Sequence, residues 1–250
     1  MGSTVCRAVA SDPELDLVAA VDVHHEGLDA RTVTGADVPG VYVSSDPSAL
    51  ADAGAEVAVD FTVVDAARSN VIWCANNGLH AVVGTTGFTD ADLEAIRAAF
   101  TSSNCLIAPN FAIGAVLMMR LAELAAPFFE SAEVIELHHD AKTDAPSGTA
   151  MLTASRLAEA SPVWSDDPTK TETLPGARGG EGPAGIRIHS VRLRGLVAHQ
   201  EVLLGTTGQS LSIRHDSYDR TSFMPGVMRA IKMIDSHPGV TVGLDSFLGF

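Results

Sequence analysis

Residues 57–87 read VAVDFTVVDAARSNVIWCANNGLHAVVGTTG, in which one helical segment lies between two short apolar segments. The first apolar segment, VAVDF at 57–61, has the length and composition of a buried strand, and the second, at 81–83, leads into GTTG. Residues 65–77 form a helical pattern that ends before Gly78, a residue type that commonly follows a helix. Short, uninterrupted apolar strands that alternate with helices are typical of a parallel sheet covered on both faces. This stretch therefore predicts an α/β fold.

The residues on either side continue the alternation of helix and strand. Residues 17–21 (LVAAV) predict a short strand that ends at Asp22, and residues 106–108 predict another. A helix is expected over 89–100, with Thr89 as its N-cap. We therefore expect residues 1–113 to form a Rossmann-type parallel sheet domain, a fold that binds dinucleotides.

The pattern changes after an apolar helical segment at 115–129. Four predicted strands follow, and among them only residues 149–160 have a strong helical pattern; the strands read VIELHH (134–139), GIRIHSVRL (185–193), HQEVLLG (199–205) and SLSIRHDS (210–217). Successive strands predict an α+β domain with an open, mixed sheet over residues 114–221. Residues 162–185 are rich in Pro, Gly, Thr and Asp and predict a long exposed loop, and residues 222–235 are helical again.

Composition excludes several classes of partner. The net charge is −15 with only 16 Lys and Arg, which disfavours nucleic acid and anionic membrane surfaces as partners. No run of 18 apolar residues is present, so no membrane-spanning segment is predicted. Cys6, Cys74 and Cys105 are odd in number and lack CxxC spacing, which favours reduced thiols in a cytoplasmic protein.

In a doubly wound sheet the ligand lies beyond the carboxyl ends of the strands. The residues at those ends are Asp22, Phe61, Thr62, Gly84, Thr85, Thr86, Ala108, Asn110 and Phe111. Asp22 lies 20 residues after Gly2, the spacing between the last glycine of a phosphate loop and the acidic residue that binds the ribose. The alternative is that Asp22 caps a loop and GTTG is only a turn.

The chain opens at MGSTVCRAVA, which already has the character of a helix. A dinucleotide fold begins with a strand and a glycine-rich loop, of which only Gly2, as the last loop glycine, is present. We expect the cause to be a start codon placed too far downstream. The alternative is a true truncation that weakens cofactor binding.

Residues 136–150 read ELHHDAKTDAPSGTA and concentrate possible catalytic groups. His138 and His139 lie in a predicted strand, where consecutive side chains point to opposite faces, so we expect no shared metal ion. A histidine alone in a strand is more often structural. Here, however, the segment also supplies Lys142 and the start of a helix, whose N–H groups bind anions; the anion-binding residues are Ser147, Gly148 and Thr149. Without a partner base, Ser147 is not expected to be a nucleophile. The pattern predicts a small carboxylate substrate that receives a proton from an imidazole.

ELHHDAKTDAPSGTA resembles the signature of the dihydrodipicolinate (4-hydroxy-tetrahydrodipicolinate) reductase family, of the actinobacterial type. Further resemblance lies in DFT (60–62), VVGTTGF (82–88), APNFAIG (108–114), LPGARG (174–179), VRLRGLVAHQEVLLGT (191–206) and RHDSYDRTSF (214–223). The resemblance implies reduction of 4-hydroxy-tetrahydrodipicolinate by NADH or NADPH in diaminopimelate and lysine biosynthesis. It also implies a homotetramer, and hinges near Gly114 and Thr221 that return residues 222–250 to the dinucleotide-binding domain.

The same resemblance implies a role for each site residue. His138 would be the general acid and Lys142 would stabilise charge, while the dicarboxylate would be bound by His139, Lys142, Ser147, Gly148 and Thr149. Asp22 would bind the adenosine ribose, and an acidic residue there favours NADH over NADPH. Two alternatives differ in class. A dicarboxylate-binding homologue without catalysis would fit an impaired cofactor site, whereas a metal hydrolase is disfavoured by the directions of the histidine side chains.

Overall fold

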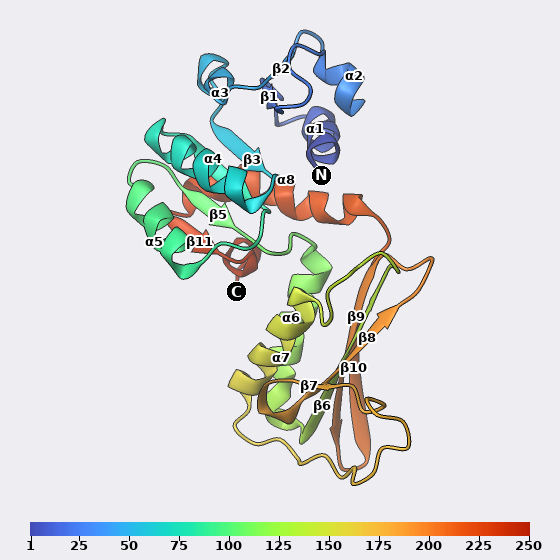
Figure 1. The fold of residues 1–250 in the computed structure, drawn as a ribbon. Helices are drawn as coiled ribbons and strands as arrows, with labels where there is room; N and C mark the ends of the chain where they lie inside the picture. Colours follow the sequence, from blue (N-terminus) through green and yellow to red (C-terminus); the bar gives the residue numbers. More distant parts are fainter. The chain divides into compact units, whose positions relative to one another are not determined.

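The computed structural model describes all 250 residues, which form two compact units (Figure 1). Unit 1 comprises Met1–Phe111 and Phe223–Phe250, and unit 2 comprises Ala112–Ser222. No helix in either unit is both long enough and apolar enough to cross a membrane.

Unit 1 contains a parallel sheet with the strand order β11-β5-β4-β3. Its strands are β3 (Val57–Asp60), β4 (His80–Val83), β5 (Cys105–Ile107) and β11 (Val240–Val242). One face packs against α4 (Val64–Asn76) and α5 (Asp90–Ala99), where Val71, Ile96 and Phe100 are among the buried side chains. The other face buries Val82 and Leu106, and α8 (Met224–Met233) contacts it. The predicted Rossmann-type parallel sheet is confirmed, with its carboxyl strand ends on a single edge.

A second, smaller parallel pair completes the strands of unit 1. β1 (Ala20–Val21) pairs with β2 (Val43–Ser44) and does not join the four-stranded sheet. Around it lie α1 (Gly2–Ser11), α2 (Ala30–Thr34) and α3 (Ser48–Asp52). The strand expected over 17–21 is shorter than predicted, because only Ala20 and Val21 have pairing partners.

The start of α5 follows the sequence closely. Thr89 is its N-cap, its hydroxyl accepts a hydrogen bond from the backbone N–H of Asp92, and the Asp92 carboxylate in turn accepts from the Thr89 N–H. This reciprocal capping box satisfies N–H groups that the helix itself cannot pair. The N-cap prediction is confirmed.

Unit 2 is built on a mixed sheet with the strand order β10-β9-β6-β8-β7. β6 and β8 are parallel and the other neighbours are antiparallel. The strands are β6 (Ser131–His138), β7 (Gly180–Glu181), β8 (Arg187–Arg192), β9 (Ala198–Thr206) and β10 (Gln209–Ser217). The predicted open, mixed sheet is confirmed, and the segment expected to be a loop over 162–185 also supplies β7 and a short 3-10 helix at Pro183–Gly185.

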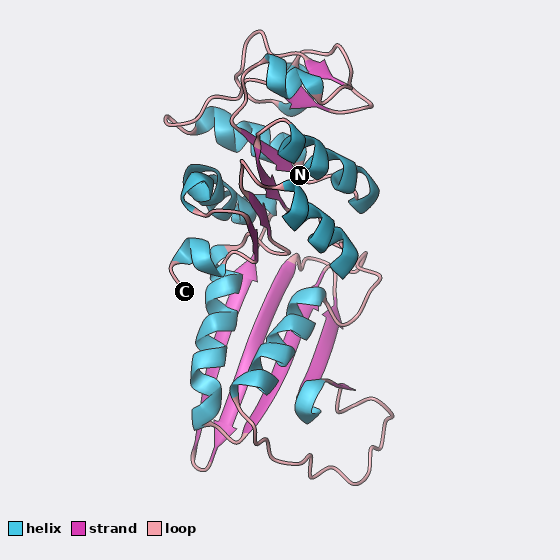
Figure 2. Ribbon diagram, turned by 90° about the vertical axis from the view of Figure 1, so that its left-hand side faces the viewer, coloured by secondary structure: helices cyan, strands magenta, loops and turns pink.

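Two helices, α6 (Ile113–Ala125) and α7 (Gly148–Ala160), lie side by side on one face of this sheet (Figure 2). That face buries Val134, Val202 and Leu204, which the pairing register places on neighbouring strands. The remaining short 3-10 helices are Ala126–Phe128 in unit 2, Arg220–Phe223 at its end, and Ile234–Ser236 and Asp245–Leu248 in unit 1.

Candidate active site

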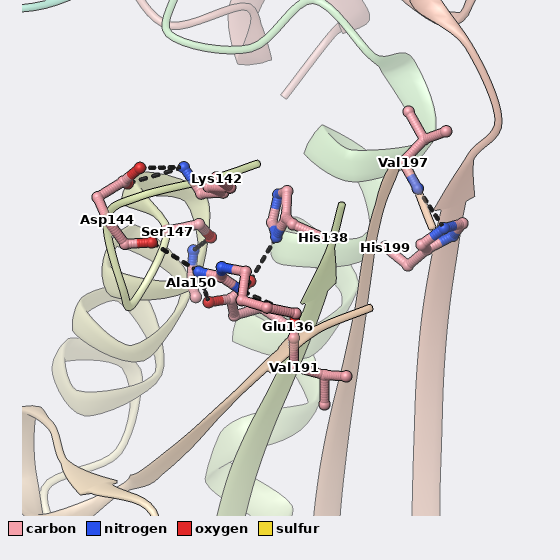
Figure 3. A network of polar contacts seen from close by, with 10 residues as sticks. Glu136, His138, Lys142, Asp144, Ser147, Ala150, Val191, Val197 and His199 are labelled. Atoms are coloured by element: carbon pink, nitrogen blue, oxygen red, sulfur yellow. Dashed lines mark hydrogen bonds and ion pairs between the residues drawn. The ribbon is translucent and has the colours of Figure 1, made fainter. Parts of the chain in front are cut away.

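His138 is the last residue of β6, and its ring is held from below by a buried carboxylate (Figure 3). Glu136 lies two residues earlier on the same strand, hence on the same face, and is fully buried. Its carboxylate bonds to Nδ1 of His138 and receives two hydrogen bonds of 2.8 and 2.9 Å from the guanidinium of Arg192. An ionised carboxylate only accepts hydrogen bonds, so Nδ1 carries a proton and Nε2 is left for chemistry.

The charges around His138 set its affinity for a proton. Burial lowers its pKa below the ordinary value, and the positive charges of Lys142 and Arg192 act in the same direction, while Glu136 opposes them. Burial also opposes the ionisation of Glu136, but hydrogen bonds from Arg192, Ser190 and His138 outweigh it and hold its pKa below the usual range. Glu136 is therefore an ionised carboxylate, and the His138 imidazolium beside it releases its proton readily.

The loop after β6 carries the cationic group of the site. Lys142 Nζ lies 2.7 Å from both carboxylate oxygens of Asp144, and this contact lowers the pKa of Asp144. The Lys142 side chain is 19% exposed, so its ammonium group is held at the surface of the site by a local partner. His139 lies just beyond the end of β6 and is exposed. Both groups are thus accessible to an anionic ligand.

The N-terminus of α7 forms the next part of the site. Ser147 is its N-cap, and the Ser147 hydroxyl accepts a hydrogen bond of 3.2 Å from the Ala150 N–H. This serine is buried and occupied as a cap, in keeping with the prediction that it is not a nucleophile. Gly148, the first residue of the helix, is exposed and presents its backbone without a side chain, and Thr149 follows it. The arrangement offers backbone N–H groups and the positive end of a helix dipole to an anion.

A buried contact ties α7 to the sheet. Gln200, directly opposite Glu136 on β9, donates a hydrogen bond of 2.7 Å to the hydroxyl of Thr153, which in turn donates to the Thr149 carbonyl. The helix that presents the anion-binding groups is therefore fixed to the same sheet face as Glu136 and His138. The structure brings His138, Lys142 and the start of α7 together.

In unit 1, Asp60 is the last residue of β3, and its carboxylate accepts hydrogen bonds from several neighbouring polar groups. One of its oxygens accepts hydrogen bonds from the backbone and hydroxyl groups of Thr62 and from the hydroxyl of Thr85, and the other accepts from Asn70. Thr85 is buried, whereas Thr62 is exposed. The predicted residues Thr62 and Thr85 are therefore brought together at the carboxyl edge of the sheet, with only Thr62 presented to solvent.

Two aromatic rings lie at the same edge. The rings of Phe61 and Phe111 have centroids 5.7 Å apart, and Phe111 is fully buried, as is Ala108. A Cβ placed on Gly84 would lie only 2.0 Å from the Phe61 ring, so this position requires glycine. Phe61 is half-buried, and the exposed residue Thr86 follows on the GTTG turn. The Phe61 ring itself packs against the backbone at Gly84, and Ala108 and Phe111 are buried at the same edge of the sheet.

The other predicted cofactor-binding residues are Asp22, Gly2 and Asn110. Asp22 follows β1, in the smaller sheet; its carboxylate accepts a hydrogen bond of 2.8 Å from the His24 N–H and bonds to His25, contacts that lower its pKa. Gly2 is the first residue of α1 and is exposed. Asn110 is half-buried and lies shortly after the end of β5 at Ile107. The contacts of Asp22 are local and do not connect it to the residues of the four-stranded sheet.

Glu136, Arg192 and Asp144 were missed as site residues in the sequence. Glu136 contacts His138, Asp144 contacts Lys142, and the Arg192 side chain contacts Glu136 and Asp144. Glu136 had a signal, because it is a charged residue at an inward position of an apolar strand, where an acid is found only with partners. Arg192 had none, because its neighbour in space lies 56 residues away in the chain. The structure contains no group of three His, Cys, Asp or Glu residues that could hold a metal ion.

Comparison with known proteins covers both units. Residues 1–111 match the family described as dihydrodipicolinate reductase, N-terminus, and residues 114–248 match its C-terminus. The chain belongs to the dihydrodipicolinate reductase family. It is 51% identical to 4-hydroxy-tetrahydrodipicolinate reductase of Nocardia farcinica (99% of this chain, 94% of that one). It is 47% identical to the reductase of Corynebacterium urealyticum, over 100% of this chain and 94% of that one.

A solved structure of a dihydrodipicolinate reductase is also similar. The dipicolinate-bound dihydrodipicolinate reductase from Paenisporosarcina sp. TG-14 is 40% identical to this chain. The match covers 98% of this chain and 94% of that one, with a TM-score of 0.85. The family, the two-part α/β fold and the class of NAD(P)H-dependent oxidoreductase predicted from the sequence are therefore confirmed. GenD2 from gentamicin A biosynthesis, solved in complex with NAD, shares the fold alone, at 16% identity and a TM-score of 0.63 over 99% of this chain and 87% of that one.

Proposed function

We propose that this chain is a 4-hydroxy-tetrahydrodipicolinate reductase in which His138 is the general acid. The observation that carries the proposal is the contact between Nδ1 of His138 and the buried carboxylate of Glu136, next to an anion-binding loop and helix. It leaves Nε2 as the atom that gives up a proton. The dipicolinate-bound relative supports a small dicarboxylate as the ligand of such a site.

The dicarboxylate binds where the cationic and N–H groups converge. Lys142 and His139 face one carboxylate, and the backbone at the start of α7, at Ser147, Gly148 and Thr149, faces the other. Binding requires Lys142 to exchange Asp144 for a substrate carboxylate. The ammonium group of Lys142 then stabilises the negative charge that develops on the ring.

The reaction adds two electrons and releases water. Elimination of the 4-hydroxyl group together with a proton from the neighbouring carbon releases water and leaves a double bond in the ring. When bound, NAD(P)H would supply a hydride to C4 of this ring, and His138 delivers one proton to the neighbouring carbon. The products are tetrahydrodipicolinate, NAD(P)⁺ and water. General acid catalysis of this kind contributes about 10²–10⁴-fold.

We assign cofactor binding to residues 1–113 together with 222–250, and substrate binding and assembly to 114–221. Asp22 binds the adenosine ribose, and its carboxylate favours NADH because it would repel a 2′-phosphate; His24 and His25 beside it moderate this preference. The exposed residues Thr62 and Thr86 and the backbone at Gly84 line the nicotinamide side with Phe61, and Asn110 lies at the next strand end.

The proposal is tested by following NADH absorbance while 4-hydroxy-tetrahydrodipicolinate is supplied, in parallel with NADPH. We expect turnover with both cofactors and a higher kcat/KM with NADH. Binding of dipicolinate without turnover of either cofactor would replace the proposal with the alternative, a dicarboxylate-binding homologue that has lost catalysis.

We propose further that the chain forms a homotetramer in the cytoplasm. α6 and α7 lie on one face of the mixed sheet (Figure 2), and the apolar side chains of Ile135, Leu137, Val191 and Leu203 lie on the other, half-exposed. A second copy of the chain would cover this face. The three cysteines are unpaired, and burial raises the pKa of Cys74 to about 12, which suits a reducing compartment.

Light scattering of the purified protein tests the assembly. We expect a mass four times that of the 26.0 kDa chain. Ile135→Glu places a charge on the uncovered sheet face and should give smaller species with an unchanged circular dichroism spectrum. A wild-type monomer at micromolar concentration would contradict the proposal.

A further inference from the structure

The Glu136–Arg192 pair contacts both the proton donor and the loop that carries Lys142. Arg192 donates one hydrogen bond to Glu136 from Nη1 and another from Nη2. Nη2 also donates a hydrogen bond of 2.7 Å to the backbone carbonyl of Asp144. Asp144 in turn holds Lys142 through both carboxylate oxygens. A chain of contacts thus runs from the His138 ring through Glu136 and Arg192 to the Lys142 loop (Figure 3 shows His138, Glu136, Asp144 and Lys142).

We propose that Glu136 and Arg192 are positioning residues that fix the His138 ring and the loop carrying Lys142 relative to each other. Glu136 sets the tautomer and the orientation of His138, and Arg192 anchors the loop of residues 139–147 to the sheet through Asp144. This inference rests on the proposed roles of His138 and Lys142, but it concerns two residues that touch neither the substrate nor the cofactor.

The cost of burying the pair argues for such a role. A fully buried carboxylate carries a large desolvation cost. Two apolar side chains in place of a buried ion pair often give equal or greater stability. The Arg192 side chain is 20% exposed, and its planar fork reaches Glu136 with two nitrogens and the Asp144 carbonyl with one of them. A lysine, with one nitrogen on a flexible stem, cannot make the same three bonds in that geometry.

The chain offers a matched control in the same sheet. Glu133 also lies on β6 and bonds to a histidine and an arginine, at 2.7 Å to His189 Nε2 and 2.8 Å to Arg178. That cluster faces the opposite side of the sheet from Glu136, and its carboxylate is 34% exposed. Glu133→Gln and Arg178→Lys therefore make the same chemical changes away from the active site.

The test compares Glu136→Gln and Arg192→Lys with the wild-type enzyme and the two control variants. We expect Glu136→Gln to lower kcat by about 10–100-fold, the range seen when an outer partner of a functional histidine is removed. Among the charged groups acting on His138, Lys142 and Arg192 disfavour its protonation and only Glu136 favours it. Loss of the Glu136 charge should therefore lower the pKa of His138, so that kcat/KM begins to fall at a lower pH than in the wild type.

Arg192→Lys is the second test if Glu136→Gln does not fold. It keeps a positive charge beside Glu136, so we expect this variant to fold. We expect it to weaken the binding of dipicolinate, used as the probe, by about 10-fold, with a smaller change in kcat, because the loop loses its anchor at Asp144. The control variants lie on the sheet face that the proposed assembly covers, so light scattering first checks that they assemble like the wild type. They should then match the wild type in kcat, in the pH profile and in dipicolinate affinity. Equal behaviour of the active-site and control variants in kcat, in the pH profile and in dipicolinate affinity would overturn the inference.

A spectroscopic measurement separates this inference from the proposed function. ¹⁵N NMR of histidine-labelled protein reports which ring nitrogen of His138 carries the proton, whether or not the enzyme turns over. We expect protonated Nδ1 in the neutral wild-type ring and a mixture of tautomers in Glu136→Gln. A wild-type ring protonated on Nε2 would sink the positioning role of Glu136, whereas a correct tautomer without turnover would count only against the proposed function.

Discussion

Replacing His138 with glutamine should lower kcat by about 10²–10⁴-fold while the affinity for dipicolinate changes little. Glutamine keeps the polar character and approximate size of the side chain, but it cannot deliver a proton. The lost step is therefore proton transfer to the ring carbon and not the binding of the carboxylates. Steady-state kinetics with NADH, together with dipicolinate titration, measures both quantities.

The pH profile identifies the titrating group. In the free wild-type enzyme, burial and two nearby cations lower the pKa of His138 below its ordinary value of 6.5, and the acid must be protonated to act. The kcat/KM value should therefore fall as the pH rises through a pKa below 6.5. In the complex, two substrate carboxylates raise that pKa, so kcat should fall only at a higher pH. His138→Gln should lose both dependences.

His189→Gln is the matched control for this variant. His189 also lies on the mixed sheet and also bonds to a glutamate of β6, but its partner is Glu133. We expect wild-type kinetics and an unchanged pH profile. If His138→Gln retained wild-type turnover, or if His189→Gln lost as much, His138 would not be the general acid.

The sequence predicted most of what local rules control. Thr89 caps α5 because a threonine three residues before an aspartate forms a capping box. The strands β3, β4 and β5 followed from short apolar runs between helical segments. The fifteen residues that include His138, Lys142 and the start of α7 are close in the chain, so their proximity in space could be foreseen.

What depends on distant residues could not be predicted in the same way. Arg192 reaches Glu136 because β8 lies parallel to β6, and nothing in a single sequence specifies that pairing. The separation of β1 from the four-stranded sheet is likewise a matter of pairing and not of composition. The buried Glu136 could have been noticed, since a lone charge in an apolar strand implies a partner, but the identity of the partner could not.

Replacing Lys142 with alanine should raise the dissociation constant of dipicolinate and also lower kcat, so that kcat/KM falls by about 10²–10³-fold. Lys142 supplies a positive charge in the loop between β6 and α7, and it acts both on the bound carboxylate and on the charge that forms in the ring. Its effect should therefore appear in both constants, unlike that of His138, which should appear in kcat alone. The ratio of the two effects distinguishes a binding cation from a proton donor.

Two further variants separate charge from packing at this position. Lys142→Met keeps most of the length of the stem and removes the charge, so it should behave like Lys142→Ala if the charge is responsible. Lys170→Ala removes an exposed lysine from the long loop of the same unit and should leave both constants unchanged. Wild-type kinetics in Lys142→Met would mean that the stem and not the ammonium group matters. In that case the start of α7 would have to bind the carboxylates without a cation, and Asp144 would be the permanent partner of Lys142 instead of one that the substrate displaces.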